Sequence, residues 1–353
     1  MLYLFNSKWW LLLIGVTLLT VSSCQQQKTL GCTSPVQAGL VKDKMCGMSI
    51  TAPKNPFVGD PMLPLNELGV KWISCLPYSI FHKNNPTIKT IHGAWWGETN
   101  EGVCTTIDHA HSHGIKVMLK PQLWNWEQWI GAFDLETEAQ WDTFEQSYTT
   151  FIMRWVHLAD SMEVDMFCIG TEIKNSVEKR PDFWRGLIDS IRQVYKGKLT
   201  YATNWDHYEK IVFWDKLDYI GIDAYFPLLR DTTPAVCDLK EAWLPTVDKL
   251  EAFSAKWTKP ILFTEFGYLS LDGCTHNTWE LEKDRHSAAI NQQAQANAVQ
   301  ALLEAFGTQD WWAGGFQWKW YPNKSAALGE GEAARDYTPQ DKLCADVLKK
   351  MYN

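Results

Sequence analysis

Two glutamates each close a short apolar run of strand length, and a carboxylate pair placed in this way could act as an acid and a nucleophile. Glu172 ends the run Phe167-Cys-Ile-Gly-Thr-Glu, and Glu265 ends the run Ile261-Leu-Phe-Thr-Glu. A run of this kind is typical of a parallel barrel strand that brings a catalytic side chain to the barrel's rim. The pair therefore predicts hydrolysis of a glycosidic bond.

The chain around these glutamates alternates short apolar runs with longer amphipathic ones. The apolar runs predict eight strands, at 44–50, 72–78, 116–121, 165–171, 199–204, 219–224, 261–265 and 315–320. Helical spacing predicts helices at 105–113, 141–161, 182–195, 239–256, 288–306 and 342–351, with shorter crossovers at 63–69 and 208–217. This alternation implies a parallel sheet covered by helices, so we expect an α/β protein with a single-domain (β/α)8 TIM barrel.

The first residues predict an export signal rather than a part of the barrel. Lys8 precedes the apolar stretch 9–21, which is short for a membrane span, and small residues then lead to Cys24. This pattern predicts a lipoprotein signal peptide at 1–23, lipid attachment at Cys24, a tether over 24–40 and the catalytic barrel at 41–353. An ordinary signal peptide and an N-terminal anchor helix are the alternatives. We expect an extracytoplasmic protein anchored by lipid to a bacterial membrane, the outer one if Gln25 directs sorting, facing either the periplasm or the surface.

Composition disfavours several other partners and cofactors. The chain has 33 Lys and Arg against 41 Asp and Glu, and this acidic balance argues against nucleic acid. Its nine cysteines show no disulfide framework, although Cys237 and Cys274 could pair. Neither CxxC nor HExxH spacing occurs, so we expect no metal and no cofactor.

Six short motifs follow one another along the chain. They are Gly-Ala-Trp-Trp-Gly-Glu at 93–98, Val-Met-Leu-Lys-Pro at 117–121, Gly-Thr-Glu at 170–172, Gly-Ile-Asp-Ala-Tyr-Phe-Pro at 221–227, Thr-Glu-Phe-Gly-Tyr at 264–268 and Gly-Gly-Phe-Gln-Trp-Lys-Trp at 314–320. Together they resemble the retaining glycoside hydrolases of clan A, and within them glycoside hydrolase family 113, which includes beta-1,4-mannanases. In this clan the acid/base follows the fourth strand and the nucleophile the seventh, which are the places of Glu172 and Glu265.

The resemblance implies a double displacement on a polysaccharide or oligosaccharide. Glu265 would attack the anomeric carbon, and Glu172 would act first as acid and then as base, with the carboxyl groups roughly 5 Å apart. Tyr225 would hydrogen-bond the nucleophile, and Trp318 would lie beneath the sugar being cleaved. Further candidate substrate contacts, at strand ends and in loops rich in stacking aromatics, are Lys120, Gln122, Asn204, Trp205, Thr171, Trp96 and Trp124.

Thr171 departs from the clan, which usually has an Asn before the acid/base to bind the sugar 2-hydroxyl. The expected substrate is mannan, glucomannan or a manno-oligosaccharide, and another beta-glycan such as a beta-glucan or galactan is left open. A non-catalytic glycan-binding lipoprotein and an inactive scaffold are alternatives of other classes. Two facing carboxylates argue against the binding protein, because such a pair is costly unless chemistry uses it, and strong catalysis would exclude the scaffold. Loops at 82–102 and 271–285 are the expected walls that decide between endo and exo action.

Overall fold

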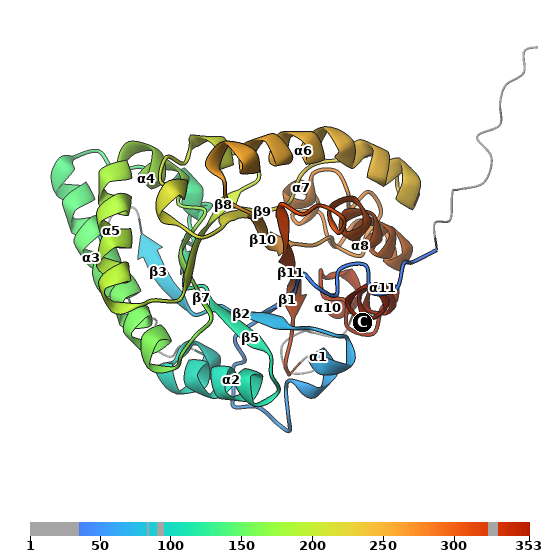
Figure 1. Ribbon diagram of the computed structural model, residues 1–353, viewed down its shortest axis with the longest axis horizontal. Coiled ribbons are helices and arrows are strands. Elements are labelled where there is room, and N and C mark those ends of the chain that lie inside the picture. Colours follow the sequence, from blue (N-terminus) through green and yellow to red (C-terminus); the bar gives the residue numbers. More distant parts are fainter. Residues whose placement is uncertain (1–34, 83–84, 90–94, 324–330) are drawn as a thin grey trace, which may run out of the picture. The chain divides into compact units, whose positions relative to one another are not determined.

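The computed structural model describes residues 35–82, 85–89, 95–323 and 331–353. Within these residues eight parallel strands close into a barrel, and Figure 1 shows them around one axis with helices outside. Their order around the barrel is β1 (Met45–Ile50), β11 (Trp312–Trp320), β10 (Ile261–Phe266), β9 (Ile220–Asp223), β8 (Lys198–Asn204), β7 (Met166–Thr171), β5 (Lys116–Leu119) and β2 (Trp72–Cys75), which returns to β1. The predicted single-domain (β/α)8 TIM barrel is confirmed.

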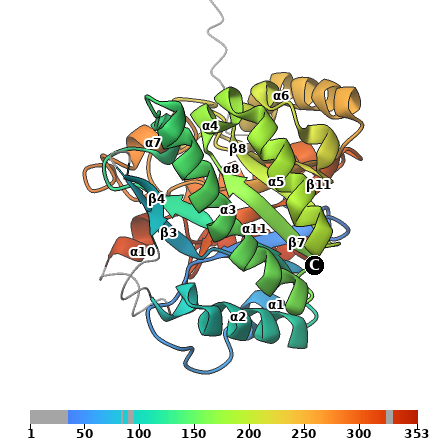
Figure 2. The same ribbon diagram turned by 90° about the vertical axis from the view of Figure 1, so that its left-hand side faces the viewer.

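Helices connect successive strands and cover the outside of the barrel. The helix α3 begins with a capping box, in which Thr137 and Gln140 each accept a backbone N–H of the first turn. Figure 2 shows α3 and α5 lying together over the outer side of β7. The α-helices are α1 (Leu63–Glu67), α2 (Asn100–Ser112), α3 (Glu138–Ser161), α4 (Lys174–Lys179), α5 (Pro181–Val194), α6 (Val236–Trp257), α7 (Thr278–Leu281), α8 (Gln292–Phe306), α10 (Glu332–Arg335) and α11 (Leu343–Tyr352).

Burial on both faces explains why the strands read as continuous apolar runs. Every residue of β7 and of β10 is buried. Alternate side chains meet two different cores: Phe263 packs outward against Phe306 of α8, whereas its neighbour Leu262 belongs to a second apolar cluster. This second cluster comes from barrel strands alone and fills the barrel interior; its buried members are Met118, Met166, Cys168, Ala202, Leu262 and Phe316.

Both strands that carry a glutamate depart from regular pairing just before it. The register of β7 against β8 shifts between Cys168 and Thr171, and that of β10 against β9 shifts between Phe263 and Glu265. Regular alternation from the inward-facing Leu262 would turn Glu265 toward the helices. Irregularities of this kind re-aim side chains next to active sites, and here they let Glu265 face the barrel axis.

Several predicted boundaries are wrong. The strand predicted at 72–78 ends at Cys75, and Tyr78 starts a separate three-stranded sheet that the sequence did not reveal. This sheet has the order β4 (Asn85–Lys89), β3 (Tyr78–His82), β6 (Gln122–Trp124). Two short 3-10 turns, Tyr208–Lys210 and Trp214–Lys216, replace the helical crossover predicted at 208–217.

The N-terminal predictions fall mostly on residues 1–34, which lie outside the described part of the chain. The signal peptide and the lipidation of Cys24 therefore stay predictions. The tether prediction is too long at its C-terminal end, because the Gly39 N–H donates to the Lys350 carbonyl at 2.9 Å and Leu40 packs against the core. Among the described residues, no helix is both long and apolar enough to cross a membrane.

The cysteines and metal-ligating side chains of the described residues can also be placed. Seven cysteines lie in this part of the chain, and no disulfide joins Cys237 to Cys274. Across the same residues, no group of three or more His, Cys, Asp or Glu side chains is arranged to hold a metal ion.

A substitution at Gly314 would test the contact between β11 and β1 that closes the barrel. Its φ is +126°, and an added Cβ would come within 2.4 Å of the Met45 backbone nitrogen. We expect Gly314→Ala to destabilise the protein by more than about 1 kcal/mol, measured by thermal unfolding, because the change adds strain and a backbone clash. Gly186→Ala in α5 is the control: nothing lies within 4 Å of its added carbon, and it should stabilise by about 0.5–1 kcal/mol. Equal stabilities would contradict this account of the closure.

Candidate active site

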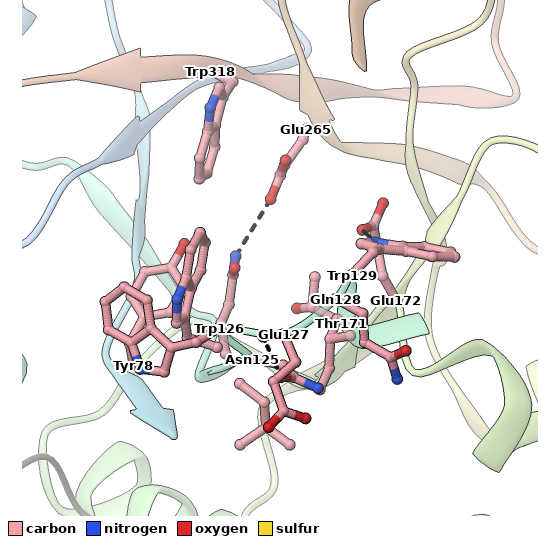
Figure 3. Close-up of a pocket in the computed structure, with 14 residues that line it drawn as sticks. Tyr78, Asn125, Trp126, Glu127, Gln128, Trp129, Thr171, Glu172, Glu265 and Trp318 are labelled. Carbon is pink, nitrogen blue, oxygen red and sulfur yellow. Dashed lines mark hydrogen bonds between the residues drawn. The ribbon is translucent and has the colours of Figure 1, made fainter. Parts of the chain in front are cut away.

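Glu172 and Glu265 line one cavity at the carboxyl ends of the barrel strands. Glu172 directly follows β7, and Glu265 is the second-last residue of β10. The cavity has a volume of about 410 Å³. Figure 3 shows its labelled residues around a central opening, with Glu265 and Trp318 on one side, Glu172 and Trp129 on a second, and Tyr78 and Trp126 on a third.

The backbone of Glu172 has an unusual conformation for a residue with a side chain. Its φ is +53°, and its N–H donates to the Ala202 carbonyl of β8 at 2.8 Å. Positive φ is uncommon outside glycine, and such backbone strain concentrates at functional sites. The bond to β8 fixes the direction in which the chain, and with it the Glu172 side chain, leaves β7.

The protonation of Glu172 is set by its surroundings. Burial raises the pKa of Glu172 to about 7, and the negative charge of Glu265 adds to the effect. The Trp129 indole N–H donates to Glu172 Oε2 at 2.6 Å and opposes the shift, because this bond favours the ionised carboxylate. A carboxyl group that titrates near neutral pH can both give a proton to a leaving group and take one from water. Glu172 therefore has the properties of a general acid/base.

Three donors hold the Glu265 carboxylate, two from the segment just after β5 and one from the segment just after β9. The Tyr225 hydroxyl donates to Oε2 at 2.8 Å, which is the contact that the resemblance implies. Gln122 Nε2 donates to Oε1 at 3.3 Å, and the Lys120 ammonium donates to the same oxygen. Contacts with a cation and neutral donors stabilise a carboxylate and fix its orientation. An ionised carboxylate fixed in this way can act as a nucleophile.

Aromatic rings form much of the rest of the cavity lining. Trp124 and Trp126 leave 48% and 69% of their surface exposed, and their ring centroids lie 5.7 Å apart at an interplanar angle of 75°. Exposed indoles offer apolar faces with a polar edge, which suit the ring of a sugar. The aromatic residues that line the cavity are Tyr78, Trp124, Trp126, Trp129 and Trp318.

Comparison with known families agrees with this geometry. The model of Glycoside Hydrolase Family 113 matches residues 55–342, a stretch that contains both glutamates and most of the barrel. The chain belongs to glycoside hydrolase family 113. It is therefore a glycoside hydrolase, as the sequence predicted, and membership of the family favours hydrolysis over the binding and scaffold alternatives.

Solved structures share the fold of this family 113 enzyme. A family 113 beta-mannanase from Alicyclobacillus acidocaldarius, in complex with ManMIm, is 23% identical and covers 89% of this chain and 99% of its own, with a TM-score of 0.73. A second structure, of a family 113 beta-1,4-mannanase, is 24% identical over 88% and 99%, also with a TM-score of 0.73. A beta-D-glucuronidase from Dictyoglomus thermophilum is more distant, with 13% identity and a TM-score of 0.58. The match covers 88% of this chain and 50% of the glucuronidase chain. No curated protein matches the sequence. At these identities the likeness shows the barrel fold alone.

The structure brings some of the predicted substrate contacts of the family 113 enzyme to the cavity. Gln122, Trp124, Thr171 and Trp318 line it. Lys120 requires a correction, because its side chain has no exposed surface and its ammonium contacts two carboxylates, those of Glu265 and Asp223, instead of reaching toward a sugar.

Three predicted substrate contacts are not among the described residues that line this cavity. Trp96 packs edge-on against Phe57, with ring centroids 5.2 Å apart. Trp205 stacks on Trp279 at 5.6 Å, and its backbone N–H donates to Asn204 Oδ1 at 2.9 Å. Contact between these three residues and a sugar stays a prediction.

The loop 125–129 supplies site residues that the sequence does not single out. Asn125, Glu127, Gln128 and Trp129 all line the cavity. The Trp-rich run from 124 to 129 signals a sugar-binding loop, but not which indole meets a carboxylate, since that depends on the path of the loop. The sequence also does not single out Asp223. Its position at a strand end can be predicted, but its contact with Lys120 joins β5 to β9, which are far apart in the sequence.

The hydrogen bond between Trp129 and Glu172 predicts a pH effect. Glu172 must carry a proton to act as an acid, so kcat/KM should fall as the pH rises through about 7. Trp129→Phe removes a bond that favours the ionised form, so it should raise the pKa of Glu172 and move this basic limb upward by about one pH unit. The measurement is kcat/KM against pH on a soluble oligosaccharide. Trp126→Phe, on the same loop but packed against Trp124, should leave the limb in place; equal movement in both variants would refute the assignment.

Proposed function

We propose that this family 113 enzyme cleaves beta-1,4-mannosidic linkages in mannan, glucomannan or manno-oligosaccharides, with net retention of anomeric configuration. The observation that carries the proposal is the contrast between two carboxyl groups in one cavity. Burial and the charge of Glu265 raise the pKa of Glu172 to about 7, while a cation and two neutral donors hold Glu265. The substrate class is supported by the family and by the beta-mannanases among the structures that share the fold.

In the first step of the proposed reaction, a Glu265 carboxylate oxygen attacks the anomeric carbon. The bond to the leaving oxygen breaks as protonated Glu172 delivers its proton to that oxygen, and a glycosyl ester forms on Glu265. Water then takes the place of the leaving sugar. Glu172, now ionised, removes a proton from this water as its oxygen attacks the anomeric carbon and releases Glu265. Loss of the negative charge on Glu265 in the ester lowers the pKa of Glu172 at the stage when Glu172 must act as a base.

The aromatic residues divide naturally between two parts of the cavity. Trp318 lies beside Glu265 in Figure 3 and is placed to support the sugar that forms the ester. Trp124 and Trp126 keep large exposed faces, which suits sugars beyond the bond that is cleaved. An extended chain rather than a single monosaccharide is therefore the substrate that uses all of these rings.

A second substrate class is favoured by one specific observation. Thr171, directly before the acid/base, has a hydroxyl that is buried and makes no hydrogen bond to any described residue. A buried hydroxyl without a partner is costly unless a ligand or water satisfies it, so this group is a candidate contact for a sugar hydroxyl. Its short reach leaves a beta-glucan or a galactan as the alternative to a mannan.

Product analysis tests the substrate class and the nucleophile together. The protein is incubated beside Glu265→Gln with mannan, glucomannan, mixed-linkage glucan, galactan and manno-oligosaccharides, and products are separated by size. We expect manno-oligosaccharides from the native protein and a loss of at least about 10³-fold in the variant, because an amide does not replace the carboxylate as nucleophile. Release from the glucan or galactan alone would overturn the mannan assignment, and full activity of Glu265→Gln would overturn the mechanism.

The role of Glu172 is tested by varying the leaving group. Glu172→Gln should slow cleavage of manno-oligosaccharides by about 10²–10⁴-fold, since their leaving oxygen needs a proton. Ester formation from a 2,4-dinitrophenyl glycoside should change far less, because that leaving group departs without protonation. Proton NMR at early times should show products with the beta configuration. Equal losses on both substrates, or products of the alpha configuration, would argue against Glu172 as the acid of a retaining enzyme.

A further inference from the structure

Lys120 occupies an unusual place for a lysine, because its whole side chain is buried at the head of the barrel. It directly follows β5, and its ammonium contacts carboxylates from two other strands. It donates to Asp223 Oδ1 of β9 at 3.3 Å and to Glu265 Oε1 of β10. The same Asp223 oxygen also accepts the Thr264 hydroxyl at 2.8 Å. Lys120 therefore bridges three strand ends beneath the cavity.

The alternation of β5 explains why Lys120 points inward. Met118, two residues earlier, belongs to the apolar cluster that fills the barrel interior. Residues two apart in a strand face the same side, so Lys120 extends from the layer above Met118. A buried ammonium in this position is costly unless charged partners compensate it, and Asp223 and Glu265 provide that compensation.

The charges around Glu265 show what the lysine contributes. Two further carboxyl groups face the site, Asp223 from β9 and Glu172 from the end of β7, and the phenols of Tyr78, Tyr225 and Tyr337 also border Glu265. Burial raises the pKa of Asp223, and the charge of Glu265 raises it further. Like charges at this spacing oppose one another's ionisation unless a cation offsets them.

The lysine itself remains charged in this environment. Burial alone would lower the pKa of Lys120, but the carboxylates of Asp223 and Glu265 outweigh burial, and the net shift is upward. The Cys168 thiol also lies close to the ammonium, and burial raises the pKa of that thiol to about 11, so it is neutral at physiological pH. Lys120 is thus a permanent positive charge in contact with Glu265.

We propose that Lys120, held in place by Asp223, is a positioning residue that keeps Glu265 ionised and fixed in orientation for attack on the sugar. This inference rests on the proposed role of Glu265 as the nucleophile. It assigns Lys120 a role through Glu265, with no contact to the substrate.

Asp223, the second partner of Lys120, has a role of its own in the proposed reaction cycle. When Glu265 forms the glycosyl ester, its negative charge is lost and the buried ammonium would stand alone. Asp223 remains as the counter-ion at this stage, so no uncompensated buried cation accompanies the intermediate. When water cleaves the ester, the regenerated carboxylate again meets a charged donor already in place.

The experiment compares the pH dependence of Lys120→Met and Asp223→Asn with that of the native protein. The substrate is a 2,4-dinitrophenyl glycoside of the sugar that the native enzyme cleaves, because its rate does not need the proton of Glu172. The acidic limb of kcat/KM then reports the step in which the Glu265 carboxylate attacks. Lys44→Met is the control, since Lys44 precedes β1 at the opposite end of the barrel and donates to the Gln309 carbonyl at 2.8 Å.

The two variants should move the acidic limb in opposite directions. Lys120→Met removes the cation and should raise the limb by about 1–3 pH units, with a large fall in kcat. Asp223→Asn removes a negative neighbour and should lower the limb. Lys44→Met should leave it in place. A merely structural role for Lys120 predicts lower activity or a lower melting temperature with both limbs at the native pH, and that outcome would overturn the proposal.

Two additions keep the test decisive. If Lys120→Met does not fold, as judged by circular dichroism, Lys120→Gln takes its place, with the same expected direction. If neither lysine variant folds, Asp223→Asn decides, and an unmoved limb contradicts the proposal. Covalent trapping with a 2-deoxy-2-fluoro glycoside separates this inference from the proposed function: a label on a residue other than Glu265 in the native protein refutes the nucleophile, whereas normal labelling of Glu265 with unshifted limbs refutes only the role of Lys120.

Discussion

The negative charge of Glu265 is the interaction on which the rest of the active site depends. It adds to the burial that raises the pKa of Glu172, so the charge of the proposed nucleophile helps the proposed acid to keep its proton. It also attracts the Lys120 ammonium, whose burial it compensates together with Asp223. Each group near this carboxylate is thus set in its protonation state by the others, and the site behaves as one coupled unit.

The barrel makes this coupling possible because it brings residues far apart in sequence to one rim. Lys120, Glu172, Asp223 and Glu265 lie at the carboxyl ends of four parallel strands, and closure of the sheet directs all of them to the same end. Regular strand geometry is not enough, however. The register shift in β10 and the positive φ of Glu172 are local departures that turn each glutamate toward the cavity. The stability of the surrounding barrel offsets the backbone strain of these local departures.

The sequence predicts the barrel, and the place of two glutamates at strand ends, because both follow from local patterns. Strands buried on both faces must be apolar throughout, and a carboxylate at the end of such a run is conspicuous, as at Glu172. What a side chain at a strand end touches is a different question. From the sequence, Lys120 is expected at the rim, where it could reach a sugar. Its contact with Glu265 arises only when the sheet from β5 to β10 closes into a barrel. The indole of Trp129 is equally ambiguous, because a loop conformation and not a periodic pattern brings it to Glu172.

Lys120 lies at the boundary between the apolar core inside the barrel and the polar residues of the candidate active site. Met118, Met166 and Leu262 fill the interior with apolar side chains, and this filling stabilises the barrel without taking part in the site. Beyond this filling, Lys120 contacts both Asp223 and Glu265, which lie at paired positions of β9 and β10, and Glu265 lines the cavity. An apolar residue at 120 would extend the core by one layer and leave Glu265 above it without its cation. The ion pair therefore separates the apolar core from the carboxylate of Glu265. In the proposed mechanism, its desolvation cost is what allows a charged nucleophile to lie at the centre of the barrel.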